Sequence, residues 1–102
     1  MSEEPRAYTT EEVRELFLKQ VRESAHYWAS LPGKTPQERC DGLAFTILNI
    51  IDGSTLPLPA FDLIPSPHPT DYQYHREHGE NWFEQEVIND CQLHEYYYPR
   101  SE

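Results

Sequence analysis

The sequence predicts a mainly α-helical fold, with an α+β fold as the alternative. The expected architecture is an antiparallel helix hairpin covered by a proline-rich extended segment and two short helices. Two helix-capping signals, each followed by an apolar pattern of helical period, predict the hairpin. Five of the nine prolines fall between residues 57 and 69, and they predict the extended cover. At 102 residues, the chain is long enough for one domain with one core.

The first helix is predicted from about Thr10 to Ser30. Thr9 and Glu12 have the spacing of a capping box, in which each side chain accepts from the other residue's backbone N–H. Apolar residues then recur at helical spacing: Val13, Leu16, Phe17, Val21, Ala25 and Trp28. The sequence LPGKTP ends this helix, with Gly33 suited to the turn.

The second helix is predicted from about Pro36 to Ile51, where Asp52-Gly53 stops it. Thr35 and Glu38 repeat the capping signal, and the proline stands where its missing N–H is not needed. The apolar residues cover nearly the whole circumference: Cys40, Leu43, Ala44, Phe45, Ile47, Leu48, Ile50 and Ile51. We therefore expect this helix at the centre of the core, with its cysteine packed as a small hydrophobic residue.

The second half of the chain is predicted to be extended, with two short helices. Because proline cannot donate to a sheet, Phe61–Ile64 is at best an edge strand. Alternating apolar residues should hold this stretch across the helices: Leu56, Leu58, Phe61, Leu63 and Ile64. Thr70 and Asp90 are the expected N-caps of the short helices Asp71–His78 and Cys91–Tyr98.

Large side chains between and after these helices are expected to complete the core. Trp82 and Phe83 should pack under a loop, and Val87-Ile88 should be buried, because such residues mostly lie inside. Three consecutive helical tyrosines point about 100° apart, so at least one of Tyr96, Tyr97 and Tyr98 should be exposed. The single domain spans residues 9–98, between tails of residues 1–8 and 99–102.

The charge is unevenly divided along the chain. Residues 1–51 hold six Lys/Arg and eight Asp/Glu, a net charge of −2, whereas residues 52–102 hold two Lys/Arg and ten Asp/Glu, a net charge of −8. Direct binding of nucleic acid or an anionic membrane requires a basic face. The composition therefore excludes those partners and favours a protein partner with a basic surface.

Cysteine usage and hydropathy predict a cytoplasmic location. The chain has only two cysteines, which is fewer than small secreted scaffolds carry. Its acidic start, MSEEPRAY, does not resemble a signal peptide. No apolar run approaches the roughly 18 residues of a membrane span.

The stretch PHPTDYQYHREHGENWFEQ, residues 67–85, is the first candidate site. His75 and His78 share one helical face, and Asp71 lies one turn earlier, while His68 or His94 could join them through the fold. Histidines with a carboxylate hold zinc or another divalent metal. The alternative, which the sequence favours, is a solvent-facing helix with no cofactor, because HExxH and zinc-finger spacings are absent.

Catalysis by a cysteine is the weakest of the chemical hypotheses. Cys91 and His94 are three residues apart and would meet on a helix, yet the sequence shows neither a third orienting group nor an oxyanion donor. Phosphate-binding glycine loops and the GxSxG motif are also absent. The sequence therefore predicts no catalytic residues and favours a binding protein over an enzyme.

Two stretches carry a resemblance: ERCDGLAFTILNIIDG, Glu38–Gly53, and PHPTDYQYHREHGENWFEQEVINDCQLHEYYY, Pro67–Tyr98. They resemble a group of small, uncharacterised bacterial and phage-type proteins with a GLAF-S/T-IL…DG helix, a GENW turn and a closing LHE segment. No activity is known for that group. The resemblance implies a small regulator or inhibitor and draws attention to these positions: Asp41, Gly42, Gly79, Glu80, Asn81, Trp82, His94 and Glu95.

The sequence thus supports two hypotheses of function. In the first, carboxylates and tyrosines of the acidic half bind a basic protein surface, with imitation of nucleic-acid phosphates as a special case: Glu77, Glu80, Glu84, Glu86, Tyr96, Tyr97 and Tyr98. In the second, the histidine stretch is a metal site. A weak homodimer through the first helix is also predicted, because that helix has apolar residues outside its main stripe: Tyr8, Leu18, Tyr27 and Leu31.

Overall fold

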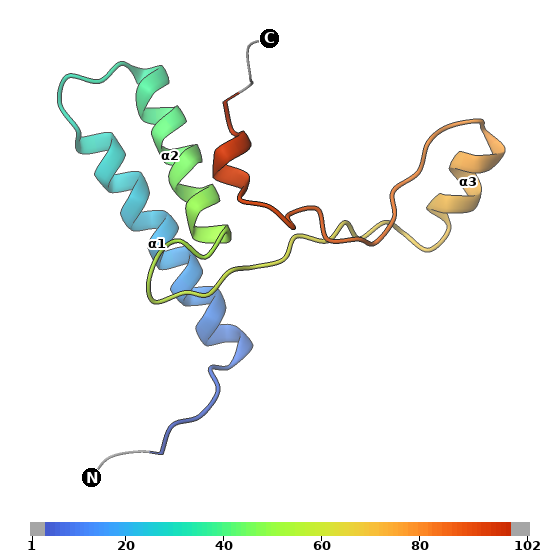
Figure 1. Cartoon of the computed structure of the whole chain (residues 1–102), viewed down its shortest axis with the longest axis horizontal. Helices are drawn as coiled ribbons and strands as arrows, with labels where there is room; N and C mark the ends of the chain where they lie inside the picture. Colours follow the sequence, from blue (N-terminus) through green and yellow to red (C-terminus); the bar gives the residue numbers. More distant parts are fainter. Residues whose placement is uncertain (1–3, 99–102) are drawn as a thin grey trace.

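A computed structural model describes residues 4–98 of the chain. Its elements are α1 (Thr10–Ser30), α2 (Pro36–Ile51), α3 (Asp71–Glu77) and the single 3₁₀ turn η1 (Leu93–Tyr96). The protein is therefore mainly helical, as predicted, and the described residues contain no β-strand. In Figure 1, α1 and α2 lie side by side, η1 lies against α2, and α3 lies at the end of a long projection.

This projection makes the molecule extended. The radius of gyration is 18.4 Å, compared with about 13 Å for a compact domain of this length. We call residues 62–92 the arm, and residues 10–61 with 93–98 the helical body. The arm leaves the helical body after the proline-rich turn, reaches α3 and returns to η1 (Figure 1).

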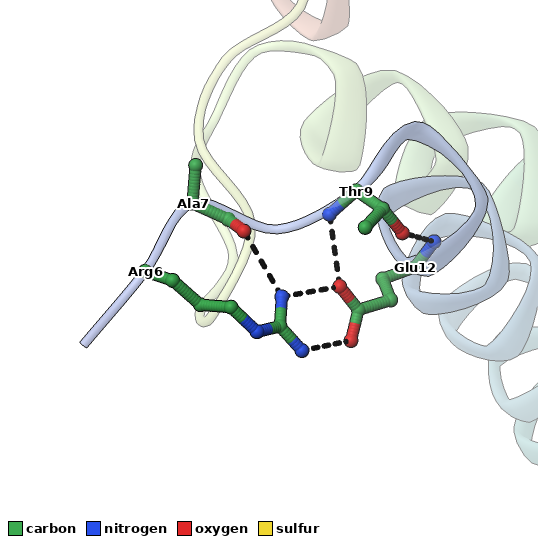
Figure 2. A network of polar contacts seen from close by, with 4 residues as sticks. All are labelled: Arg6, Ala7, Thr9 and Glu12. Carbon is green, nitrogen blue, oxygen red and sulfur yellow. Dashed lines mark hydrogen bonds and ion pairs between the residues drawn. The ribbon is translucent and has the colours of Figure 1, made fainter. Parts of the chain in front are cut away.

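The start of α1 is held by a network of four residues, which Figure 2 shows. Thr9 Oγ1 accepts from the Glu12 backbone N–H at 3.1 Å, and Glu12 Oε1 accepts from the Thr9 N–H at 2.8 Å. The Arg6 guanidinium donates to both carboxylate oxygens, at 2.8 and 3.0 Å, and to the Ala7 carbonyl at 3.0 Å. The bonds from Arg6 and from the Thr9 backbone lower the pKa of Glu12 to about 2. The predicted capping box is confirmed, and Thr35 with Glu38 forms the second one on α2.

A glycine lets α1 and α2 approach each other closely. Trp28 lies against Gly42, where a Cβ would come within 2.4 Å of the indole ring. The indole N–H donates to Thr46 Oγ1 at 2.9 Å, and that hydroxyl donates to the Gly42 carbonyl at 2.8 Å. The contact therefore combines ring packing with a satisfied polar edge, and it needs a residue without a side chain on α2.

The core lies where the proline-rich segment crosses the two helices. Ile50 of α2 and Leu58 of the segment are only 1% and 4% exposed. Gln20 of α1 fixes this crossing, because its side chain donates to the Leu56 carbonyl at 3.2 Å and accepts from the Thr55 hydroxyl at 3.0 Å. The segment is thus bonded to α1 while its one buried leucine completes the core.

A tight turn after α2 sends the chain back along the helix. Gly53 has φ +79°, and a Cβ there would lie 2.7 Å from the Ala60 nitrogen, so both the backbone conformation and the close approach require glycine. Phe61 then donates its backbone N–H to the Ile51 carbonyl at 2.8 Å. The centre of its ring lies 5.5 Å from that of the Phe17 ring, in an edge-to-face contact. Phe61 is where the chain leaves the helical body for the arm.

The two sides of the arm are joined at its base by one asparagine. Asn89 accepts from the Leu63 backbone N–H at 2.8 Å and donates to the Phe61 carbonyl at 2.6 Å. The Ile88 N–H also donates to the Leu63 carbonyl at 2.9 Å. The side chain of Asn89 thus stands in for the backbone partners that a regular strand pair would supply.

The burial predicted for several residues is wrong. Trp82 and Phe83 are 39% and 72% exposed, and Val87 and Ile88 are 40% and 58% exposed. These residues lie on the arm, which consists of α3 and two extended segments. These few elements cannot enclose them. Cys40 is also exposed rather than packed, because it lies near the start of α2, beyond the crossing that forms the core.

The two short helices differ from prediction in length, capping and position, because α3 lies at the end of the arm and does not cover the helix hairpin (Figure 1). Thr70 makes no capping bond to α3; its hydroxyl lies 2.8 Å from His68 Nδ1 instead. The helix ends one residue earlier than expected, at Glu77, and Gly79 with φ +68° follows it. The last predicted helix is reduced to η1, and Asp90 does not cap it.

Candidate functional site

A polar cluster built around one buried carboxylate joins the end of α2 to η1. Asp52 is 8% exposed, and its carboxylate accepts from the backbone N–H groups of Leu93 and His94, both at 2.9 Å. The same carboxylate lies 2.7 Å from His94 Nδ1. The carboxylate that caps η1 therefore comes from 41 residues earlier in the chain, at the C-terminal cap of α2.

Two opposing effects act on the Asp52 carboxyl. Burial by itself raises its pKa, whereas the hydrogen bonds from His94 and Leu93 lower it. The hydrogen bonds outweigh burial, so its pKa lies below the ordinary value for aspartate. Asp52 is thus a carboxylate at neutral pH, and His94, whose ring also meets the edge of Phe45 at 5.4 Å, is oriented from two sides.

Asp52 orients His94 as the carboxylate of a catalytic triad would, but the candidate nucleophile, the Cys91 thiol, is not bonded to this histidine. Within residues 4–98, the Cys91 thiol makes no hydrogen bond to His94. Cys91 lines a shallow cavity of about 410 Å³, of which the His94 side chain is not a wall. The cluster is therefore a structural clamp that fastens η1 to α2.

The histidines of the predicted metal site lie in two separate parts of the molecule. His94 is in the clamp, whereas His68, His75 and His78 are at the end of the arm (Figure 1). Each histidine of the arm has a local partner. His75 Nδ1 lies 3.2 Å from Glu80 Oε1, and His78 Nδ1 donates to the Tyr74 carbonyl at 2.7 Å. The Asp71 carboxylate accepts from the His68 backbone N–H at 3.0 Å.

No group of three or more His, Cys, Asp or Glu side chains within residues 4–98 is arranged to hold a metal ion. The side chains of His68, His75 and His78 instead make their polar contacts within α3 or its flanking turns. Zinc binding by the stretch stays a prediction, which elemental analysis of untagged protein would test.

The residues predicted to bind a partner fall into two groups. Glu77, Glu80, Glu84 and Glu86 are exposed on the arm, whereas the three tyrosines lie at η1. Tyr96 and Tyr98 are 59% and 58% exposed, which confirms that the triplet cannot be buried whole. Tyr97 donates its hydroxyl to Asp41 at 2.7 Å, and this bond raises the tyrosine's pKa.

The arm is the part of the described chain that gathers exposed apolar surface and negative charge. Seven of the thirteen large hydrophobic residues that are markedly exposed lie on it: Ile64, Tyr72, Tyr74, Trp82, Phe83, Val87 and Ile88. It also holds seven carboxylates and a single basic residue, Arg76, for a net charge of −6. Exposed aromatic residues beside charge are typical of contact surfaces in proteins.

Aromatic contacts shape the end of the arm. The rings of Tyr72 and Trp82 meet edge to face at 4.8 Å, which ties α3 to the returning segment. The Arg76 guanidinium lies 5.9 Å from the centre of the Tyr72 ring and donates to its hydroxyl at 2.9 Å. The Trp82 indole N–H donates to Glu84 at 2.8 Å.

Sequence reasoning missed three residues that build these features. Asp52 was interpreted only as part of the Asp-Gly stop of α2, and Asn89 carried no motif. Pro67 was interpreted as a backbone constraint, although it lines a cavity at the end of the arm. The only available signal was a polar residue directly beside apolar neighbours, as in the sequences IIDG and VIND.

No protein-family model, curated protein or solved structure matches the chain. Within residues 4–98, no helix combines the length and the apolar character that crossing a membrane requires. The site therefore has to be interpreted from its own geometry.

Proposed function

We propose that this protein is a small non-catalytic binding protein whose arm attaches to a basic surface on another protein. The observation that carries the proposal is the arm itself, which projects from the helical body with a net charge of −6 and seven exposed large hydrophobic side chains. A chain does not keep so much apolar surface in water without cost, and a partner would remove that cost.

The two properties of the arm have separate roles in this function. The carboxylates attract a basic partner over a distance, which raises the rate of association. The aromatic side chains then supply the area that holds the complex, because large rings dominate the energy of most interfaces. The exposed tyrosines of η1 stand on the helical body and extend the contact if the partner is large.

The biological role that fits this surface is regulation or inhibition. A bound arm would cover the partner's basic face and exclude whatever that face normally binds. Where the face binds nucleic acid, the arm's carboxylates occupy the places of phosphates. The free thiols of Cys40 and Cys91 fit the cytoplasmic location that the composition predicts.

The experiment is a pull-down from host lysate at low and raised salt, followed by binding measurements on the partner it identifies. In the test variant, Glu77, Glu80 and Glu86 of the arm are changed to glutamine. The matched control changes Glu11, Glu15 and Glu23 of α1 in the same way, so both variants lose three charges. We expect the arm variant to bind at least tenfold more weakly, and the control to bind within twofold of the natural protein.

Salt separates the electrostatic contribution from the apolar one. Raised salt should weaken binding of the natural protein more than binding of the arm variant, because the variant has less charge to screen. Equal loss in both variants, or a partner retained without any salt dependence, would refute a charge-guided arm.

A further inference from the structure

A cavity of about 450 Å³ lies at the end of the arm, between the segment before α3 and the segment that returns from it. Its volume is within the range of about 300–1,000 Å³ in which small ligands and side chains are held. Its walls combine two rings, two prolines, two carboxylates and two further polar side chains: Tyr72, Phe83, Pro67, Pro69, Glu84, Glu86, His68 and Gln85.

We infer that this cavity receives an arginine side chain from the basic partner. The inference rests on the proposed function, and it names the chemical group that the arm recognises. An arginine head is flat and carries a positive charge, so it stacks on aromatic rings and pairs with carboxylates at the same time. Tyr72 and Phe83 supply the rings, and Glu84 and Glu86 supply the charge.

The carboxylates of the cavity have capacity left for such a ligand. Glu86 forms no hydrogen bond or ion pair within residues 4–98. Glu84 accepts one bond, from the Trp82 indole, and a carboxylate has about four acceptor positions. Both carboxylates therefore have acceptor positions left for the N–H groups of a guanidinium.

The chain itself shows that a guanidinium fits the Tyr72 ring. Arg76 already lies 5.9 Å from the ring centre, and it is not one of the cavity walls. Phe83, which also lines the cavity, is 72% exposed and makes no ring contact within residues 4–98. A second guanidinium from the partner would cover this ring and bring it out of water.

The histidine in the wall is held in place by the turn before α3. His68 Nδ1 lies 2.8 Å from the Thr70 hydroxyl, and the Thr70 backbone N–H donates to it at 3.2 Å. The edge-to-face contact between Tyr72 and Trp82 holds a second residue of the cavity wall, Tyr72.

The experiment uses the full chain, labelled for NMR, and three short peptides that differ at one position: arginine, its uncharged isostere citrulline, or lysine. We expect the arginine peptide to shift the signals of Tyr72, Phe83 and Glu86. The citrulline peptide should bind at least tenfold more weakly, and lysine should fall between the two because it lacks the flat head. Equal binding of the arginine and citrulline peptides would overturn the inference.

Two variants separate the cavity from the rest of the arm. Phe83→Leu removes an exposed ring without disturbing a ring contact, and it should weaken binding of the arginine peptide at least fivefold. Tyr8→Leu, which removes another exposed ring that makes no ring contact within residues 4–98, is the matched control and should leave peptide binding unchanged. If the peptide binds but Phe83→Leu has no effect, the cavity is not the arginine site, and the proposed function of the arm is unaffected. If no basic peptide binds, the arginine site is refuted, and the pull-down variants test the function of the arm independently.

Discussion

The helical body and the arm contain similar proportions of aromatic residues, eight of 58 and four of 31, but they use them in opposite ways. In the helical body, Trp28 is fitted against a glycine, and Ile50 and Leu58 are almost completely buried. On the arm, Phe83 and Ile88 remain mostly exposed. The difference shows that aromatic residues alone do not make a core, because enclosing a side chain requires neighbours on several sides.

The polar contacts of the two regions differ in the same way. Asp52 connects residues more than 40 positions apart and is shielded from water. Most polar contacts near α3 join residues within five positions and are exposed, as for His75 with Glu80 and Gln73 with Glu77. Long-range contacts define the helical body, and local contacts define the end of the arm.

The largest expected effect comes from truncating one side chain in each region. Ile50→Ala should lower the free energy of unfolding by about 2–5 kcal/mol, because a buried isoleucine leaves a cavity. Phe83→Ala removes a larger side chain from the arm, yet it should change stability by less than about 0.5 kcal/mol. Urea unfolding measures both. Comparable losses would mean that the arm has a core of its own.

Removing the clamp between α2 and η1 should have the next largest effect. Asp52→Ala leaves the N–H groups of Leu93 and His94 without their acceptor, at a cost of about 1–3 kcal/mol. Asp62→Ala, which removes an exposed carboxylate from the arm, is the control. Thermal unfolding followed by circular dichroism compares the two variants.

The same carboxylate makes stability depend on pH. The pKa of Asp52 is lower in the folded protein than its ordinary value, so the folded state favours the charged form. Its contribution is complete above the unfolded pKa of about 4 and is lost as the pH falls through the lower folded value. The natural protein should therefore lose more stability between pH 5 and pH 2 than Asp52→Asn does; identical pH profiles would contradict the clamp.

Closing the gap between α1 and α2 should have a smaller net effect. Gly42→Ala places a Cβ within 2.4 Å of the Trp28 ring. The strain of about 1–3 kcal/mol is offset by roughly 1 kcal/mol from the better helix propensity of alanine, which leaves a loss of about 0–2 kcal/mol. In the double variant with Trp28→Leu, the strain should disappear, so a double-mutant cycle measures it directly. Additive effects would show that the ring is not the obstacle.

Self-association through α1 should be weak. Tyr8 and Tyr27 are 66% and 60% exposed, Leu18 is 40% exposed, and the arm that carries most of the charge projects elsewhere. Light scattering at two protein concentrations in raised salt should show a mass rising above the monomer value of 12.0 kDa. Tyr27→Ser should remove the rise, and a constant 12.0 kDa for the natural protein would reject the dimer.

The smallest effect is confined to the start of α1. The Arg6 guanidinium is the main cause of the low pKa of Glu12, which is about 2 (Figure 2). Arg6→Ala should raise this pKa toward the ordinary value for glutamate without changing the fold. Titration of the carboxyl carbon by NMR measures it, with Glu38 in the second capping box as the internal reference. An unchanged Glu12 pKa would show that the capping bonds alone are responsible.

The bounds of the two long helices were predictable from sequence because their signals are local. Thr9 with Glu12, and Thr35 with Glu38, mark both starts within one helical turn. Gly53 marks the end of α2 because its φ is positive. Of the candidate site, the sequence identified the carboxylates of residues 77–86 and the exposure of the tyrosine triplet, since charge and the 100° step of a helix need no tertiary contact.

Burial and clustering were decided by tertiary structure alone. Nothing in the residues around Trp82 and Phe83 distinguishes a ring in a core from a ring on a projecting arm, because that depends on what lies opposite after folding. Asp52 became the cap of η1 only because α2 ends beside it, and Tyr72 and Phe83 came to line one cavity only because the arm turns back on itself. The helices, their caps and the distribution of charge follow from the sequence, because neighbours in the chain are sufficient for them. The core, the clamp and the cavity form only when residues far apart in the sequence meet.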